Sequence, residues 1–129
     1  MPPLPSKKVL VVEDEVFIQS MYADQLRGAG FLVSTAGDGE AGLAAVEENQ
    51  PDAVLLDILL PKLDGFEMLK RLRANPRFAK VPVIILTNLS QPEDVERGLA
   101  LGANDYLVKA RFLPSEIVDK VKSLLTYEV

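Results

Sequence analysis

The 129-residue sequence contains no cysteine and no histidine. The absence of cysteine excludes disulfides, thiolate nucleophiles and cysteine-ligated zinc or iron–sulfur centres. The absence of histidine excludes histidine-based catalytic triads, imidazole acid–base chemistry and most transition-metal sites. The side chains left for chemistry are therefore carboxylates, hydroxyls, amines and guanidinium groups, together with hard cations that oxygen atoms can hold.

Positive charge is scarcer than negative charge, with 14 Lys and Arg residues against 19 Asp and Glu residues and a net charge of −5. An acidic balance disfavours binding to nucleic acids and to anionic membrane surfaces. No apolar run is long enough for a signal-peptide core or a membrane span, and the longest run, residues 81–86, contains Pro82. We therefore expect a cytoplasmic protein that binds neither nucleic acids nor membranes. The length and the 48% hydrophobic content fit one folded domain.

Short apolar runs alternate with helical patterns five times along the chain. The runs predict strands at residues 9–12, 31–36, 53–56, 83–86 and 105–108. The patterns that follow them predict helices at residues 18–28, 38–48, 64–72, 90–99 and 114–125. The apolar pattern of the first helix includes Met21, and that of the fourth includes Leu99. Ser90 and Glu93 have the spacing of a capping box, which predicts the start of the fourth helix.

Strict alternation of strands and helices predicts a doubly wound α/β fold, in which helices cover both faces of a five-stranded parallel sheet. The first, third and fourth strands are continuously apolar, as strands buried on both faces must be. The second strand contains Ser34 and Thr35 and the short fifth strand contains Asp105, which fits positions at the sheet edges. Right-handed crossovers then favour the flavodoxin-like strand order 2-1-3-4-5. We expect this domain to span residues 7–127, after an irregular N-terminal extension over residues 1–6.

Reactive side chains stand at the carboxyl ends of four predicted strands. They are Glu13 and Asp14 after the first strand, Asp57 after the third, Thr87 at the end of the fourth and Lys109 after the fifth. Parallel strands share one carboxyl edge and ligands bind where the strand order reverses, so Asp14 and Asp57 should flank a crevice there. Carboxylates crowded together repel one another unless a cation lies among them. Because only oxygen ligands are available, we expect Mg²⁺ as the cofactor.

Phosphoryl transfer is the chemistry that these side chains fit. Asp57 with bound Mg²⁺ can act as a carboxylate nucleophile toward phosphorus, which gives an aspartyl phosphate. Lys109 can neutralise one phosphoryl oxygen, and the Thr87 hydroxyl can donate a hydrogen bond to another. Phosphoryl transfer depends chiefly on positioning and charge stabilisation, which this set of groups supplies.

Four segments carry these residues in a fixed order. They are Val-Val-Glu13-Asp14-Glu15, Leu-Leu-Asp57-Ile-Leu-Leu-Pro61-Lys-Leu-Asp64-Gly65, Leu86-Thr87 and Gly102-Ala-Asn-Asp105-Tyr106-Leu-Val-Lys109. Together they resemble the receiver domains of bacterial two-component response regulators, over nearly the whole chain. The resemblance implies that Asp57 is the phosphoacceptor, that Asp14 binds the metal directly and that Glu13 binds it mainly through water. It also implies that the backbone carbonyl of Leu59 is a metal ligand.

The resemblance further implies a switch between the site and one surface. When a phosphoryl group draws the Thr87 hydroxyl toward it, Tyr106 would turn inward and repack the face made by the fourth helix, the fifth strand and the fifth helix. The implied phosphodonor is the phosphohistidine of a sensor histidine kinase or histidine phosphotransferase. The implied signal recipient is a downstream protein or an output domain, with homodimer formation on phosphorylation as a further option. Such a protein catalyses its own phosphorylation and dephosphorylation but is not a turnover enzyme.

Three features depart from the usual pattern of that family. Ala110 stands where a proline usually follows the lysine, and the connection to the last helix is one residue longer. Asn88 stands where a small residue is usual, and its amide can narrow the access of phosphate or contact it. Leu59 and Leu89 are expected to flank the path of the attacking water. Since neither side chain can orient that water, we predict slow self-dephosphorylation.

Three other interpretations fit parts of the sequence. Residues 37–42 read Gly-x-Gly-x-x-Gly between a strand and a helix, as in dinucleotide-binding folds. However, the preceding strand is partly polar, and Asp38 and Glu40 would place negative charge where a pyrophosphate must lie. A phosphatase of the haloacid dehalogenase type needs a second acid at the position of Leu59. The remaining alternative is a pseudo-receiver that binds partners without being phosphorylated, which the departures from the family pattern leave open.

Overall fold

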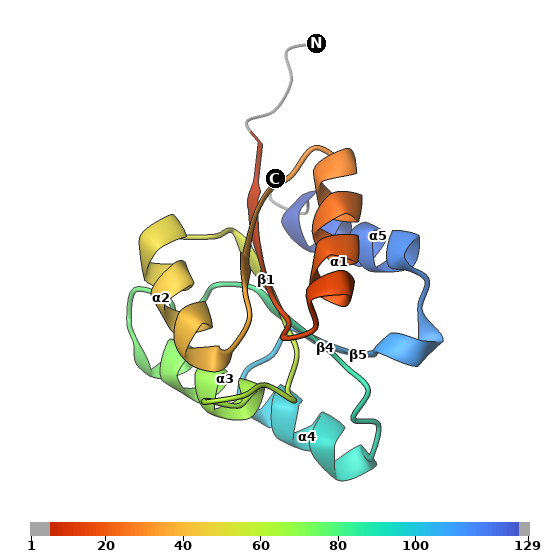
Figure 1. Ribbon diagram of the computed structural model, residues 1–129. Coiled ribbons are helices and arrows are strands. Elements are labelled where there is room, and N and C mark those ends of the chain that lie inside the picture. Colours follow the sequence, from red (N-terminus) through yellow and green to blue (C-terminus); the bar gives the residue numbers. More distant parts are fainter. Residues whose placement is uncertain (1–5, 127–129) are drawn as a thin grey trace.

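The computed structural model describes residues 6–126, so the expected N-terminal extension lies outside the described residues except for Ser6, as does residue 127. A five-stranded parallel sheet with the order β2-β1-β3-β4-β5 forms its centre (Figure 1), which confirms the predicted topology. The strands are β1 (Lys8–Val12), β2 (Leu32–Ala36), β3 (Ala53–Leu56), β4 (Val83–Thr87) and β5 (Asp105–Val108). The helices are α1 (Val16–Gly28), α2 (Gly39–Asn49), α3 (Gly65–Ala74), α4 (Pro92–Ala100) and α5 (Pro114–Thr126), with one 3₁₀ turn, η1 (Lys109–Arg111). Within residues 6–126, every helix is too short or too polar to cross a lipid bilayer.

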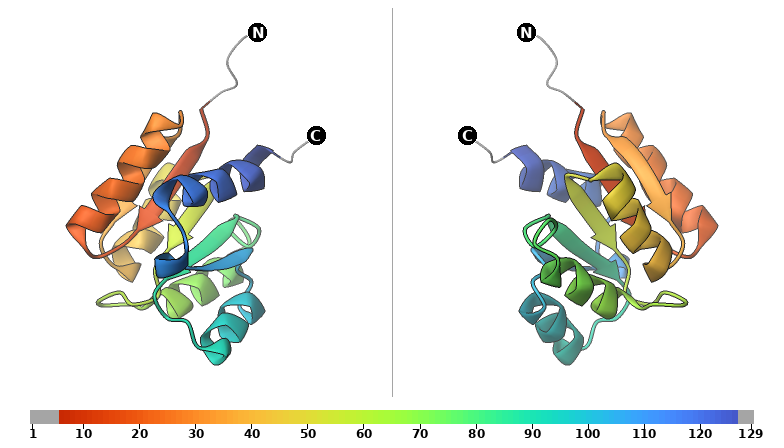
Figure 2. Two further views of the ribbon diagram at one scale, coloured as in Figure 1. Left: turned by 90° about the vertical axis from the view of Figure 1, so that its right-hand side faces the viewer. Right: turned by 90° about the vertical axis from the view of Figure 1, so that its left-hand side faces the viewer.

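Helices cover both faces of the sheet (Figure 2), with α1 and α5 on one face and α2, α3 and α4 on the other. Successive side chains of a strand point to opposite faces. Leu10 and Val12 of β1 therefore join the core beneath α2 and α3, whereas Val9 and Val11 join the core beneath α1 and α5. All residues of β3 and β4 are buried, which explains why their sequences are apolar throughout.

The polar strands lie at the two edges of the sheet, as the sequence predicted. In β2, Ser34 is half-buried and Thr35 is exposed, and in β5 the first residue, Asp105, is half-buried. The strand before the glycine motif of residues 37–42 is thus an edge strand. The dinucleotide interpretation requires a central strand at that point, so the topology counts against it.

The helix starts agree with the sequence in two cases and disagree in one. The side chains of Asp38 and Asp64 cap α2 and α3 by accepting a hydrogen bond from a backbone N–H three residues later. The capping box predicted at Ser90 is wrong, because the residue that caps α4 is Gln91 and its side chain makes no capping bond. Pro92 begins the helix with its fixed φ angle, which moves the cap one residue beyond Ser90.

Two residues expected on apolar helix faces are exposed. Met21 is 39% exposed and Leu99 is 47% exposed. The buried side of α1 consists of Tyr22, Ala23 and Leu26. The buried residue of α4 is Gly98, and a Cβ atom there would lie 2.6 Å from Cδ1 of Ile85. Helix α4 approaches the sheet so closely that a glycine takes the place that the periodicity assigned to a leucine.

Candidate functional site

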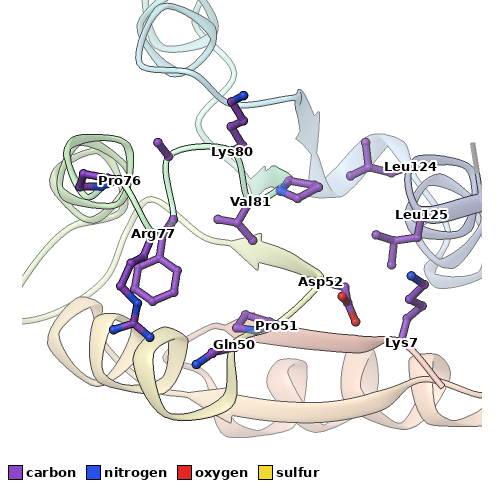
Figure 3. A pocket seen from close by; sticks show the side chains of 13 residues that line it. Lys7, Gln50, Pro51, Asp52, Pro76, Arg77, Lys80, Val81, Leu124 and Leu125 are labelled. Atoms are coloured by element: carbon purple, nitrogen blue, oxygen red, sulfur yellow. The ribbon is translucent and has the colours of Figure 1, made fainter. Parts of the chain in front are cut away.

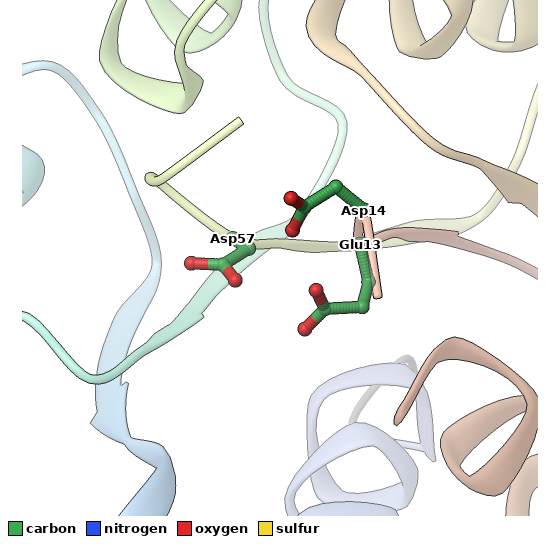
Figure 4. Close-up of side chains that lie close together, drawn as sticks. All are labelled: Glu13, Asp14 and Asp57. Atoms are coloured by element: carbon green, nitrogen blue, oxygen red, sulfur yellow. The ribbon is translucent and has the colours of Figure 1, made fainter. Parts of the chain in front are cut away.

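Three carboxylates meet at the carboxyl edge of the sheet. One oxygen from each of Glu13, Asp14 and Asp57 lies within 4.8 Å of the others, and Figure 4 shows the three side chains around one space. The register of the sheet causes this, because β1 and β3 pair as far as Val12 and Leu56, so the next residue of each strand lies at the same height. The backbone N–H of Asp57 donates to the carbonyl of Val12 at 3.0 Å, which extends the pairing by one residue.

Lys109 reaches this cluster from the end of β5. Its ammonium donates to Oδ2 of Asp57 at 2.8 Å and to Oε1 of Glu13. The three side chains are 12%, 8% and 3% exposed, so the pairs are largely shielded from water. Burial alone would lower the pKa of Lys109, but the hydrogen bonds to both carboxylates outweigh it and raise that pKa. Burial raises the pKa of Glu13, and the bond from Lys109 offsets part of that rise.

The backbone fixes the orientation of Asp57. Its Oδ1 accepts hydrogen bonds from the backbone N–H groups of Ile58 at 2.7 Å and Leu59 at 3.3 Å, which leaves Oδ2 toward Lys109. Gly65 makes this turn possible, because a Cβ atom at that position would lie 2.2 Å from the carbonyl oxygen of Asp57. The Asp64-Gly65 pair of the sequence motif therefore caps α3 and lets the chain pack against Asp57.

Thr87 and Tyr106 lie on neighbouring strands and meet the same loop residue. Thr87 is fully buried, and its Oγ1 accepts a hydrogen bond from the backbone N–H of Leu89 at 3.4 Å. The hydroxyl of Tyr106 donates to the carbonyl oxygen of Leu89 at 2.8 Å. Burial, followed by the negative charges of Asp94 and Asp57, raises the pKa of Tyr106 to about 12. Both side chains are thus linked to the loop that joins β4 to α4.

The residues that depart from the family pattern lie at the end of β5 and in the loops after β3 and β4. The chain after Lys109 forms the 3₁₀ turn η1, and the bond to Ala110 is trans. Lys109 nonetheless reaches both acids. Asn88 is exposed beside the site, Leu59 is 58% exposed, and Leu89 is half-buried against the core beneath α2 and α3.

One aromatic residue near the site carried no functional signal in the sequence. Tyr22 of α1 is buried and lines a cavity of about 10 Å³ together with Glu13, Asp57 and Lys109. Burial is the main reason why the pKa of Tyr22 is raised, and the nearby charges of all three polar residues also act on it. Helical spacing marked Tyr22 only as an apolar position, because periodicity cannot tell which buried residue lies beneath a polar site.

A much larger cavity lies at the opposite edge of the sheet. It measures about 510 Å³ and lies between the α3–β4 loop and the end of α5 (Figure 3). Lys7, Arg77 and Lys80 contribute positive charge to its wall, and Asp52 contributes negative charge. The carboxylate of Asp52 already accepts a hydrogen bond from the backbone N–H of Lys8 at 2.7 Å. This edge has space but, among the residues that the structure describes, no group of acids comparable to that at the carboxyl edge.

The donor set at the carboxyl edge fits a hard divalent cation. Glu13, Asp14 and Asp57 offer carboxylate oxygens only, which suits Mg²⁺ better than metals that prefer nitrogen or sulfur ligands. Asp14 is exposed, whereas Glu13 and Asp57 are buried, so an ion would be reached from the Asp14 side. The residues present therefore pass the chemical test for a magnesium site.

Comparisons with known proteins agree with these observations. Residues 9–122 match the response regulator receiver domain family. The chain is 42% identical over 120 residues to the alkaline phosphatase synthesis transcriptional regulatory protein PhoP of Bacillus subtilis strain 168, covering 93% of this chain and 49% of that protein. The chemotaxis protein CheY4 of Vibrio cholerae superposes with a TM-score of 0.87 and 33% identity, covering 94% of this chain and 100% of that chain. The Mn²⁺-bound form of the response regulator Rcp1 superposes with a TM-score of 0.81 and 30% identity, covering 95% of this chain and 96% of that chain. The chain spans about half the length of the curated relatives that it matches.

Proposed function

Because the chain belongs to the response regulator receiver domain family, we propose that it acts as a phosphorelay switch that accepts a phosphoryl group on Asp57. The observation that carries this proposal is the arrangement of Asp57, with Oδ1 held by two backbone N–H groups and Oδ2 beside Lys109 and two further carboxylates. A carboxylate held in this way is oriented for attack on phosphorus, and the groups around it can stabilise developing charge.

The proposed reaction transfers the phosphoryl group from nitrogen to oxygen. An oxygen of Asp57 forms a bond to phosphorus as the bond from phosphorus to the donor's histidine nitrogen breaks, and the released imidazole takes a proton from solvent. Mg²⁺, held by Glu13, Asp14, Asp57 and the carbonyl of Leu59, would neutralise charge on the phosphoryl oxygens. The similar structure of Rcp1 is a Mn²⁺-bound form, which supports the proposal that this chain also binds a divalent cation.

Lys109, Thr87 and Tyr106 have separate proposed roles. The Lys109 ammonium turns from Glu13 and Asp57 to an oxygen of the bound phosphoryl group. The Thr87 hydroxyl donates to another oxygen and gives up the hydrogen bond that it accepts from Leu89. Because Tyr106 is bonded to the carbonyl of that same leucine, the change reaches the face of α4, β5 and α5. Self-phosphorylation and self-dephosphorylation would be the whole of the catalysis.

The proposed partners follow from this chemistry. A sensor histidine kinase or histidine phosphotransferase would supply the phosphoryl group, and a downstream protein or output domain would respond to the altered face. Homodimer formation on phosphorylation is one form of that response. The proposed location is the cytoplasm, and cell fractionation of the tagged protein tests it.

The decisive experiment is incubation with Mg²⁺ and acetyl phosphate, followed by intact mass measurement. We expect a phosphoryl adduct on the wild type and none on Asp57→Asn. Asp52→Asn, at the opposite edge of the sheet, is the matched control and should still form the adduct. A wild type that binds Mg²⁺ but forms no adduct, with an NMR spectrum that beryllofluoride leaves unchanged around Thr87 and Tyr106, would favour the pseudo-receiver instead.

A further inference from the structure

The glycine motif at residues 37–42 is not explained by phosphoryl transfer. Its three glycines have different surroundings. Nothing lies within 4 Å of the place where Gly37 would carry a Cβ atom. At Gly39, that atom would lie 2.0 Å from the carbonyl oxygen of Leu63, and at Gly42 it would lie 2.8 Å from Sδ of Met68. Only at Gly39 is the obstacle backbone, which cannot move aside as a methionine side chain can.

The backbone that touches Gly39 is the β3–α3 loop, residues 57–64. The loop is bonded within itself, from Leu63 N–H to the Pro61 carbonyl at 2.7 Å, and to the start of α3, from Gly65 N–H to the Ile58 carbonyl at 2.9 Å. Lys62 within it has a φ angle of 66°, in the left-handed region that few side chains adopt. A loop that is internally bonded and strained in this way resists local adjustment, so pressure at Leu63 would shift it as a unit.

A second contact fixes the loop to the same place. The ammonium of Lys62 lies 3.9 Å from a carboxylate oxygen of Asp38, the residue before Gly39 and the cap of α2. The Lys62 side chain is 64% exposed, so this ion pair adds little stability on its own. Leu60 and Leu63 of the loop also pack against the core, so the loop has no free space to move into when Gly39 gains a side chain.

The same loop begins at the candidate site. The N–H groups of Ile58 and Leu59 hold Oδ1 of Asp57, and the carbonyl of Leu59 is the proposed backbone ligand of the cation. We propose that Gly39 is a positioning residue for the cation site, because only a residue without a side chain lets the β3–α3 loop lie where Leu59 can serve the site. This inference rests on the proposed function, since it assumes that the carboxylate cluster binds Mg²⁺.

The test compares alanine at each of the three glycines by titration with Mg²⁺ alone, followed by NMR. We expect Gly39→Ala to weaken Mg²⁺ binding about tenfold, the size of effect usual when support behind a ligand is lost. Gly37→Ala should leave the affinity unchanged, because its new methyl group meets nothing. Gly42→Ala should lower the melting temperature through the contact with Met68 and leave the affinity unchanged. Alanine favours helices over glycine, so a loss at Gly39 cannot come from helix propensity.

A readout without metal separates positioning from general damage. In Mg²⁺-free protein, the amide signals of Ile58 and Leu59 should shift in Gly39→Ala, whereas amides of β5 should not. If Gly39→Ala is too unstable to study, Lys62→Gly in the same chain relieves the left-handed strain and lets the loop move away from the new methyl group. That double variant should fold and still bind Mg²⁺ more weakly than Lys62→Gly alone.

Two results can be told apart. Wild-type protein that does not bind Mg²⁺ would remove the proposed function and this inference with it. Wild-type protein that binds Mg²⁺, together with unchanged affinity in folded Gly39→Ala or in the double variant, would overturn this inference and leave the proposed function standing.

Discussion

The strands of the sheet end at the carboxyl edge and begin at the amino edge, and each of these two edges holds a partly buried cation. The two cations have different partners. At the carboxyl edge, Lys109 bonds to the carboxylates of Glu13 and Asp57. At the amino edge, Arg73 bonds to uncharged oxygens, namely the carbonyls of Phe78, Val81 and Gly102 and the side chain of Asn104. In the proposed function Lys109 exchanges its partners for phosphoryl oxygens, whereas Arg73 holds together the backbone of two loops. Burial lowers the pKa of Arg73, and no carboxylate among the described residues pairs with it.

The cavities at the carboxyl and amino edges also differ, and the larger one is not at the cluster of acids. The cavity at the carboxyl edge has about 10 Å³ and the one at the amino edge about 510 Å³. Glu13, Asp57 and Lys109 line the small cavity. The proposed function therefore rests on the cluster of charged groups at the carboxyl edge, whereas cavity size alone would point to the amino edge.

The largest expected effect comes from a substitution that removes the contacts of Arg73 at the amino edge and leaves the carboxyl edge intact. Arg73→Met leaves several backbone carbonyls without donors, so we expect a loss of about 2–3 kcal/mol in the free energy of unfolding. Urea denaturation measures this loss. Mg²⁺ affinity and the phosphoryl adduct should remain as in the wild type. Arg71→Met is the matched control: this exposed arginine pairs with Glu67 at 3.3 Å, and its removal should change stability by less than about 0.5 kcal/mol. A large loss of Mg²⁺ affinity in Arg73→Met would contradict the separation of the two edges.

The next effect concerns the rate of dephosphorylation at the carboxyl edge. The phosphorylated wild type should lose its phosphoryl group slowly, because the exposed Leu59 side chain cannot orient an attacking water. Leu59→Asn supplies an amide that can, and we expect the decay to become about tenfold faster. Mass measurements after removal of acetyl phosphate follow the decay. Leu99→Asn, the same change on exposed α4, should have no effect. Rapid decay in the wild type would refute the expectation.

The Tyr106 hydroxyl allows a test by pH. Its pKa rises from 10.0 in the unfolded chain to about 12 in the fold, so its contribution to stability is complete below pH 10 and is lost as the pH rises toward 12. Tyr106→Phe loses the bond to the Leu89 carbonyl and should be less stable than the wild type by about 1 kcal/mol below pH 10. The difference should shrink between pH 10 and 12, as measured by urea denaturation at each pH. A constant difference would mean that the hydroxyl is not shielded in the fold.

The smallest expected effect concerns competition at the carboxyl edge. The Lys109 ammonium occupies oxygens of Glu13 and Asp57 that a bound cation would also use. Lys109→Met should therefore bind Mg²⁺ about threefold more tightly while its phosphorylation slows, because one charge that stabilises the phosphoryl oxygens is gone. Lys120→Met, on the exposed side of α5, controls for the change of net charge. Weaker Mg²⁺ binding in Lys109→Met would show that the ammonium supports the site and does not compete for it.

The sequence predicted the fold and the meeting of the acids for one reason. In a parallel sheet, strand order and strand direction together decide which residues share an edge, and both left a record in the pattern of apolar residues. The pairing of Asp57 with Glu13 and Asp14 followed from that topology alone. Details that depend on three-dimensional packing did not follow. Periodicity placed Leu99 on the buried side of α4, whereas the closeness of α4 to the sheet leaves room only for Gly98.

Contacts between a side chain and a distant backbone atom were the least predictable from the sequence. Arg73 binds carbonyls that are up to 29 residues away, and carbonyl oxygens have no sequence signature. The glycine motif of residues 37–42 showed the opposite problem: its pattern was visible, but its meaning depended on where Leu63 comes to lie. Helix caps formed an intermediate case, since Asp38 and Asp64 behaved as their residue type predicts while Pro92 displaced the expected cap at Ser90.

The ring of Glu13, Asp14, Asp57 and Lys109 has a consequence for the valence of whatever ion enters it. Three carboxylates and one ammonium leave two unbalanced negative charges at that spot. A doubly charged ion makes this group of side chains electrically neutral. A singly charged ion leaves a net negative charge that repels an anionic donor, and a triply charged ion leaves a net positive charge that retains the transferred phosphoryl group. The charge of the ion, more than its radius, would then decide which ions permit both phosphorylation and dephosphorylation of Asp57.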